Sequence, residues 1–428
     1  MDPLLQYMGA EELGLDENGG GGEVVHGDVA EANVVAEVAE LTAVIEEQTA
    51  EIEKLADAVE ETEEVVEELQ EQVEGLESML NSGNYNSISF TNTYNSALRK
   101  AAKLGCEFTG DRVGAESMGD IASANLMARA GIEAIGETLK NWGTKAVNFI
   151  KHIFNSIINF FVSIVSKADA LQRRVDQLRK RINDGAAIKK KIKLGGWNVY
   201  IDYASAGLGG VSKRNKGTTA GTDAGIAALI EEAGKVDGIT ASGVKSAYGT
   251  LVSGLKADAT AFGKYNAKKQ GGKDLLVSQS AGVRLVASFS EPTMESLNEA
   301  ASAIRSVSLS VTKAPEAKKL SSGEVAAKAD KSGLITALDG VKTSIQSIRD
   351  GKLKKQLTNT QRDQLIGKLN NVKAGDGDKS SEVNGKVAVI KATYALAARM
   401  TAVGERDTIN TAGAVLDAVA AHLGFGKE

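Results

Sequence analysis

The chain has 428 residues, with 50 Lys and Arg, 56 Asp and Glu, and a formal net charge of −6. Only 4% of its residues are aromatic and only 3 are Pro, whereas Gly and Ala are abundant. This composition favours helices over a β-sandwich or barrel. The one cysteine, Cys106, excludes an internal disulfide framework and is typical of a reducing compartment.

The charges are divided unequally along the chain. Residues 1–80 hold 24 acidic residues and one basic residue, Lys54, which gives a net charge of −23. Residues 81–428 therefore hold 32 acidic and 49 basic residues, a net charge of +17. An acidic part joined to a basic part indicates a protein whose basic part faces nucleic acid or another polyanion. The alternative is that the acidic residues form a solvated helix face.

The acidic part carries a heptad pattern. Residues 1–33 form an acidic tip with a Gly run, which predicts a flexible linker. Over residues 34–80 the apolar positions alternate at spacings of 3 and 4, and β-branched residues alternate with Leu, which favours a parallel coiled-coil dimer with a second copy. The alternative is a single amphipathic helix packed on the rest of the chain. The predicted seam comprises Leu41, Ile45, Ile52, Leu55, Val59, Val66, Leu69, Val73 and Leu76.

A connector and long helices are predicted next. Residues 81–119 are polar and Gly-rich, with a short helix inside them. Residues 120–182 repeat apolar side chains at helical spacing and predict one or two long amphipathic helices. Lys and Asn interrupt the most apolar stretch, Phe149 to Val165, so we expect a core helix there, with a membrane-surface helix as the less favoured alternative.

Residues 183–428 are expected to form a basic, mostly helical domain. Strand-like alternation occurs near residues 197–203 and 283–289, and the two segments are candidates to pair. The predicted fold class is therefore mainly α: an acidic N-terminal coiled coil, an amphipathic helical segment, and an Ala/Gly-rich, mostly helical α(+β) domain with a short hairpin. Helices are expected at about 222–235, 241–257, 294–307, 322–347, 360–372 and 384–423.

No catalytic site, metal site or cofactor is predicted. The three histidines, His26, His152 and His422, are far apart in the sequence, and no nucleotide-binding or nucleophile motif is complete. A structural protein is therefore favoured over an enzyme. Basic clusters remain, and they predict contact with phosphate groups independent of base sequence. The first two clusters comprise Lys189, Lys190, Lys191, Lys193, Lys213, Arg214 and Lys216, and others lie at 264–273, 313–319 and 352–355.

One stretch carries a family resemblance. It runs from Ile135-Gly136-Glu137-Thr138-Leu139-Lys140-Asn141-Trp142 through an Ile/Phe-rich helix to Leu171-Gln172-Arg173-Arg174. Over about residues 112–182 the chain resembles the internal head proteins of large tailed (jumbo) bacteriophages. The resemblance implies a protein made in the host cytoplasm that enters the prohead with the scaffold or core. There the prohead protease cuts it, and its mature part stays with the packaged DNA in the virion interior.

The resemblance also implies where the protease cuts, which is after a small residue, any residue and Glu. Gly114, Ala115 and Glu116 fit this motif before Ser117, in the Gly-rich connector, and Gly105, Cys106 and Glu107 are the second choice. The motif also ends at Glu11, Glu60, Glu77 and Glu324. A cut after Glu116 would release a piece with a net charge of −22 and leave +16 on the remainder.

The expected function is that of a virion-internal structural protein whose acidic propeptide is removed and whose basic part binds DNA without sequence preference. Three alternatives stay open. The coiled coil is permanent, in a scaffold or tail structural protein; the protein is membrane-active and ejected with the DNA; or residues 195–428 contain an enzyme, for which the sequence offers no constellation.

Overall fold

The structure is a computed structural model of the chain and is mainly α-helical, with small antiparallel sheets, as the composition predicts. Over residues 121–149 it describes the backbone and the side chains of Ala122 and Ile132. The described residues are 35–37, 39–40, 43–48, 50, 54, 65, 68–69, 71–81, 85–103, 121–208, 220–315, 317–350, 356–372 and 380–424.

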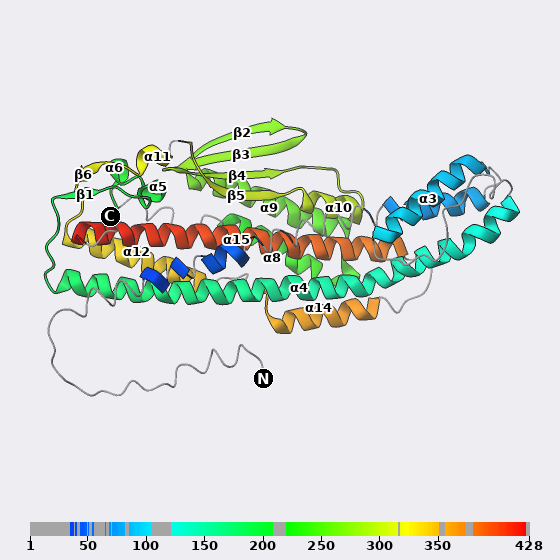
Figure 1. Ribbon diagram of the computed structural model, residues 1–428, viewed down its shortest axis with the longest axis horizontal. Coiled ribbons are helices and arrows are strands. Elements are labelled where there is room, and N and C mark those ends of the chain that lie inside the picture. Colours follow the sequence, from blue (N-terminus) through cyan, green and yellow to red (C-terminus); the bar gives the residue numbers. More distant parts are fainter. Residues whose placement is uncertain are drawn as a thin grey trace, which may run out of the picture.

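The longest helix, α4 (Ile121–Asn183), runs the length of the molecule (Figure 1). From Ile150 to Leu178, buried side chains recur at spacings of 3 and 4 residues, which places them along one side of the helix. Two basic residues, Lys180 and Arg181, lie in the last turn, where they complement the helix dipole. Gly185 follows with a φ of 87°, a left-handed conformation that suits Gly and ends the helix.

Five helices pack with α4 into one bundle. The last of them, α15, contacts α4, α8, α12 and the short helix α10 (Leu297–Arg305), so it lies at the centre of the core. Buried residues from Ile150 to Leu423 form one continuous core, and residues 150–182 and 183–428 are therefore parts of one unit. The five helices are α8 (Ala220–Ala233), α9 (Ala241–Phe262), α12 (Lys331–Arg349), α14 (Asn359–Val372) and α15 (Ser380–Leu423).

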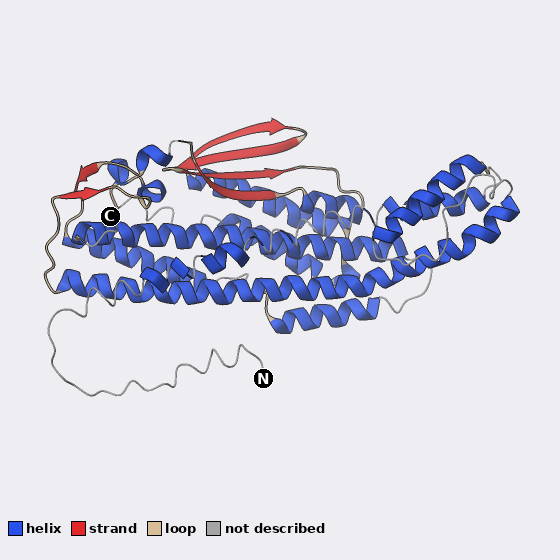
Figure 2. Ribbon diagram, viewed as in Figure 1, coloured by secondary structure: helices blue, strands red, loops and turns tan. Residues whose placement is uncertain are grey.

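A four-stranded antiparallel sheet covers one side of the bundle, in the order β2-β3-β4-β5 (Figure 2). Two-residue turns join β2 to β3 and β3 to β4. In the first turn both Gly271 and Gly272 have positive φ, as a hairpin turn of this kind requires. On one face Val283, Leu285 and Phe289 are buried towards the helices. The strands are β2 (Lys264–Gln270), β3 (Lys273–Ser280), β4 (Val283–Phe289) and β5 (Ser308–Lys313).

Short elements complete this unit. Strands β1 (Lys191–Lys193) and β6 (Glu324–Ala326) form an antiparallel pair at one end of the bundle. The helix α10 (Leu297–Arg305) joins β4 to β5, and Ser296 caps it by accepting a hydrogen bond from the Glu299 N–H at 3.2 Å. The others are α5 (Asn198–Ile201), α6 (Tyr203–Ala206), the 3-10 helix η3 (Val236–Gly238) and α11 (Ala317–Leu320).

The strand expected at residues 283–289 is confirmed as β4, but the strand expected near residues 197–203 is wrong. That segment forms α5 and α6 instead, separated by Asp202 in a left-handed conformation with a φ of 45°. The buried side chain of Asn198 explains the difference. It donates to the Leu320 carbonyl and accepts from the Tyr203 N–H, at 2.7 and 2.6 Å, so it satisfies backbone groups that a strand would pair with another strand. The pairing of the two predicted strands is absent.

A second, smaller core lies near the N-terminal end of α4. The helix α3 (Ser87–Lys103) buries Phe90, Tyr94 and Ala97 against Leu69 and Leu76 of the acidic part. Partly buried Ile132 of α4 also packs there. Figure 1 shows α3 at the end of the molecule away from β1 and β6. This small core is therefore built mostly from residues 65–103.

Candidate functional site

Four residues of the predicted coiled-coil seam are described, and the chain itself covers them. Ile45 is 1% exposed and belongs to the large core, whereas Leu69, Val73 and Leu76 belong to the small core beside α3. At these four residues the acidic part packs on its own chain, as in the second of the two alternatives that the heptad pattern left open. Self-association of two copies stays a prediction. Leu41, Ile52, Leu55, Val59 and Val66 lie outside the described residues.

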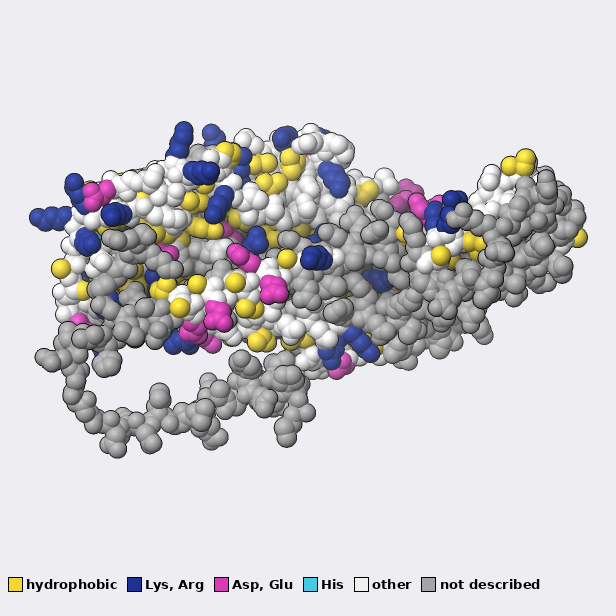
Figure 3. All heavy atoms as spheres, in the orientation of Figure 1, with side chains coloured by type: hydrophobic (Ala, Val, Ile, Leu, Met, Phe, Trp, Pro, Cys, Tyr) yellow, Lys and Arg dark blue, Asp and Glu magenta, His cyan; other side chains and the backbone are white. Residues whose placement is uncertain are grey.

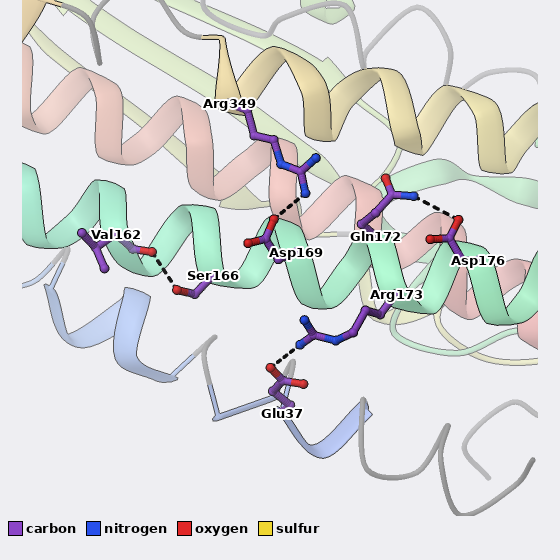
Figure 4. A network of polar contacts seen from close by, with 8 residues as sticks. All are labelled: Glu37, Val162, Ser166, Asp169, Gln172, Arg173, Asp176 and Arg349. Atoms are coloured by element: carbon purple, nitrogen blue, oxygen red, sulfur yellow. Dashed lines mark hydrogen bonds and ion pairs between the residues drawn. The ribbon is translucent and has the colours of Figure 1, made fainter. Parts of the chain in front are cut away.

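Two acidic residues of the same segment as Ile45 lie near cations of α4. The Glu37 carboxylate forms an ion pair with Arg173, and Figure 4 shows the two side chains extended towards each other. Lys167, six residues before Arg173 on α4, is 3% exposed. Burial lowers its pKa to about 8, and the nearby Glu46 carboxylate opposes that shift. Among the described residues, the acidic part therefore contacts α4 through the Glu37–Arg173 ion pair and lies close to Lys167, while Ile45 joins the large core.

Other ion pairs of α4 are part of the fold. Asp169 and Arg179 pair with Arg349 and Asp339 of α12, and Figure 4 shows the Asp169 pair on the side of α4 away from Glu37. The guanidinium of Arg174 is almost buried and lies 2.7 Å from an Asp417 oxygen of α15. These contacts fix α4 against the centre of the bundle rather than presenting charge to a ligand.

The predicted cleavage residues Gly114, Ala115, Glu116 and Ser117, and the alternative Gly105, Cys106 and Glu107, lie outside the described residues. Two competing motifs are described. Glu77 follows the fully buried Leu76 inside a helix, and Glu324 begins β6, where it is paired with Lys193. Because proteases need an extended, accessible backbone, the burial of Leu76 in a helix disfavours a cut after Glu77. Ser322, Gly323 and Glu324 are exposed, so burial does not disfavour a cut after Glu324.

The first basic cluster lies at the end of the bundle. Lys189, Lys190, Lys191 and Lys193 are exposed, and Ile192 between the last two is buried. Lys191 and Lys193 therefore share the solvent face of β1. Lys213, Arg214 and Lys216 lie outside the described residues, so the structure does not test whether the two clusters meet.

The sequence interpretation missed another arrangement of basic residues. The cluster at residues 264–273 forms most of the β2–β3 hairpin. The strand register places Lys264 in the same row as Arg284 of β4, with Gln279 of β3 between them. Figure 3 shows Lys and Arg side chains over the upper part of the molecule, where Figure 1 places this sheet. The sequence signal was the Gly271-Gly272 pair, since two glycines between short segments are typical of a hairpin.

A buried polar network joins the last turn of α15 to α6. The Tyr203 hydroxyl lies 2.7 Å from Nε2 of His422, whose Nδ1 lies 2.7 Å from the Ala418 carbonyl oxygen. The Lys328 N–H donates to the same hydroxyl. Since Nδ1–H donates to the carbonyl, the Nε2 of a neutral ring accepts from Tyr203. Every one of these groups is satisfied, so we assign the network to packing rather than chemistry.

The described residues offer little other chemistry. Over the described residues, no three His, Cys, Asp or Glu side chains are grouped to hold a metal ion. Two described helices have the length and composition of a membrane span, Ile153–Asn183 and Gly385–Leu423. Of the apolar windows in these helices, 56% and 89% are buried inside the protein. Core helices of water-soluble proteins have the same properties, and these two form the centre of the bundle.

Comparison with known proteins identifies the chain at the level of its family. None of the curated proteins and none of the solved structures matches it. The family model of phiKZ-like phage internal head proteins matches residues 40–427, which include Ile45 of the acidic part, α4 and the whole bundle. The chain therefore belongs to the family of phiKZ-like phage internal head proteins, which are structural proteins of the phage head.

Proposed function

We propose that this internal head protein enters the prohead with its acidic N-terminal part attached, that the prohead protease removes that part, and that the basic remainder associates with packaged DNA. The first cut would follow Glu116, with Glu107 as the alternative. The observation that carries the proposal is how little the large core depends on the acidic part.

Among the described residues before α4, Ile45 is the one member of the large core, whose other buried members run from Ile150 to Leu423. The small core draws its fully buried members from residues 69–101. A cut in the connector would thus remove the small core almost whole. Of the described residues before α4, the large core would lose the burial of one, Ile45, which is worth about 2–3 kcal/mol. Such an arrangement suits a part that is detached after assembly.

The charges support the second half of the proposal. Before cleavage the net charge of the chain is −6, so its average field repels DNA. Removal of residues 1–116 would leave +16 on residues 117–428. It would also free Arg173 from Glu37 and take Glu46 away from Lys167. The change in sign would couple DNA association to processing inside the prohead.

Intact-mass and N-terminal analysis of the protein from mature particles tests the cleavage. The expected N-terminus is Ser117, or Phe108 for the alternative cut. An intact N-terminus in mature particles would exclude the propeptide. For DNA association, particles are opened at low salt and the DNA is sedimented. We expect the protein to sediment with DNA and to dissociate as the salt concentration rises, because the contacts are ionic. A protein that stays in the supernatant at low salt would contradict that half.

A further inference from the structure

The outer face of the sheet β2–β5, which points away from the helices, carries several basic side chains. It is defined by the positions that alternate with the buried Leu285 and its neighbours. The register places Lys264 beside Gln279, and Gln279 beside Arg284. Lys268 of β2 and Lys273 of β3 belong to the same face, because they are an even number of residues from Lys264 and Gln279. The outer face thus holds three Lys and one Arg.

No carboxylate lies on this outer face of the described sheet. Asp274 is the one acidic residue in the four strands, and its partner in the ladder is Phe289, which is buried on the opposite face. The remaining outer positions are hydroxyls of β4 and β5, amides of β2, and the apolar Leu275, Val277 and Val286 at the middle of the face. The Ser288 and Ser308 hydroxyls lie 2.8 Å apart, and Thr312 is paired with Arg284. Ammonium, guanidinium and hydroxyl groups are all donors that bind phosphate oxygens.

Arg284 is held in position on this face. It lies on the central strand β4, and its Nε donates to the Gln279 side-chain oxygen at 3.2 Å. Lys264 and Lys268 are four residues apart on β2, which is about 13 Å along a strand, or the rise of about four base pairs. The outer positions carry no aromatic side chain, since Tyr265 alternates with them. A surface that binds by stacking on unpaired bases needs such rings.

We propose that the outer face of the sheet is the surface through which this protein contacts the phosphate backbone of double-stranded DNA. The inference rests on the proposed association with DNA and names its surface. The other explanation of the lysines is protection of the edge strand β2 from pairing with another sheet. That explanation accounts for Lys264 and Lys268. It does not account for Arg284 on a central strand or for the lack of acidic residues, because carboxylates protect an edge as well.

The acidic part does not occupy this face where it is described. Its contacts at Glu37 and Ile45 are with α4 and the large core, and its contacts at Leu69 and Leu76 are with α3. At the described residues, the effect of the acidic part on the outer face is therefore one of overall charge rather than steric cover. DNA binding by the uncut chain should recover as the acidic residues are neutralised, without a change in the sheet.

The test uses the full chain, folded intact and then cut at a site for a specific protease inserted between Glu116 and Ser117. Binding to a random-sequence duplex is measured by fluorescence anisotropy over a range of salt concentrations. The sheet variant is Lys264→Gln, Lys268→Gln and Lys273→Gln. The matched control, with the same loss of charge, is Lys180→Gln, Lys331→Gln and Lys342→Gln, all exposed residues of α4 and α12.

We expect the sheet variant to bind at least about tenfold more weakly and its salt slope to fall by about 2–3, since each lost phosphate contact removes about 0.9. The control should lose less than about threefold. Equal losses in both variants, or a preference for single-stranded DNA, would overturn the outer face as the duplex-binding surface. If the cut parent protein binds no DNA at low salt, the proposed association itself fails. Thermal unfolding of each variant checks that the sheet is intact.

Discussion

The Tyr203 hydroxyl and Nε2 of His422 lie 2.7 Å apart, and this buried contact joins α6 to the last turn of α15. Burial lowers the pKa of His422 from its usual 6.5. Below pH 6.5 the unfolded chain therefore binds a proton that the folded chain does not. The stability from this site is complete above pH 6.5 and is lost as the pH falls towards the lower folded pKa.

We expect the free energy of unfolding of the wild type to fall more steeply between pH 7.5 and 5 than that of His422→Phe, which has no ring to protonate. Denaturant unfolding at several pH values measures both. The comparison isolates His422 because the other acidic groups are shared by the two proteins. Parallel pH profiles would show that His422 titrates alike in the folded and unfolded chains.

The hairpin of α8 and α9 should be sensitive to a single methyl group. A Cβ added at Gly225 would lie 2.2 Å from the Leu251 Cα, closer than any real contact. We expect Gly225→Ala to destabilise the protein by about 1–3 kcal/mol, since the helices must move apart. Gly249→Ala on α9 is the control, because nothing lies within 4 Å of its added Cβ. It should be neutral or stabilise by up to about 1 kcal/mol. Equal effects in denaturant unfolding would contradict the close packing.

The two carboxylates that pair with α4 arginines should differ in how much each contributes to the free energy of unfolding. Asp417→Asn leaves the Arg174 guanidinium, whose side chain is 6% exposed, without its ionic partner. We expect a loss of about 2 kcal/mol. Asp339→Asn removes a partner that is 57% exposed from Arg179, and solvent screening should limit that loss to below about 1 kcal/mol. Chemical denaturation of both variants gives the comparison, and a larger effect at Asp339 would refute this ranking.

Ile45 provides a test of whether the acidic helix packs on its own chain or on a second copy. If it packs as described, Ile45→Ala should release the helix around it and raise the hydrogen-exchange rates of residues 35–50, with a local loss of about 2–4 kcal/mol. Sedimentation should show no change in mass. Glu47→Ala, at an exposed position two residues on, is the control. A variant that dissociates from dimer to monomer would support the parallel coiled coil instead.

Periodicity in the sequence predicted the helices well and the sheet poorly. The stripe from Ile150 to Leu178 repeats over many turns, so α4 could be recognised without knowledge of its neighbours. Strand β2 is exposed at nearly every position and has no apolar alternation. Its backbone pairing with β3 places it in the sheet, and its side chains give no sign of a strand. Strand β4 alternates buried and partly exposed residues, and it was predicted correctly.

For the candidate surfaces, too, some features could be predicted from the sequence and others depend on the fold. The charge of the acidic part could be counted in the sequence. Its position beside Arg173 and Lys167 depends on contacts between residues more than 100 positions apart in the chain. The heptad pattern could not specify the partner, since an apolar seam is equally satisfied by a second copy or by the same chain. The outer face of the sheet depends on the register of strands that are separate in the sequence.

The central position of α15 has a consequence for the making of the protein. This helix follows α4, α8, α10 and α12 in the chain, yet it supplies the apolar side that all four pack against. While the chain is being synthesised, those helices lack their common partner, and their apolar faces stay open to other molecules. The bundle can close only after translation has passed residue 423. Newly made chains should therefore depend on chaperones, or on the net charge of −23 of residues 1–80, to stay soluble until that point.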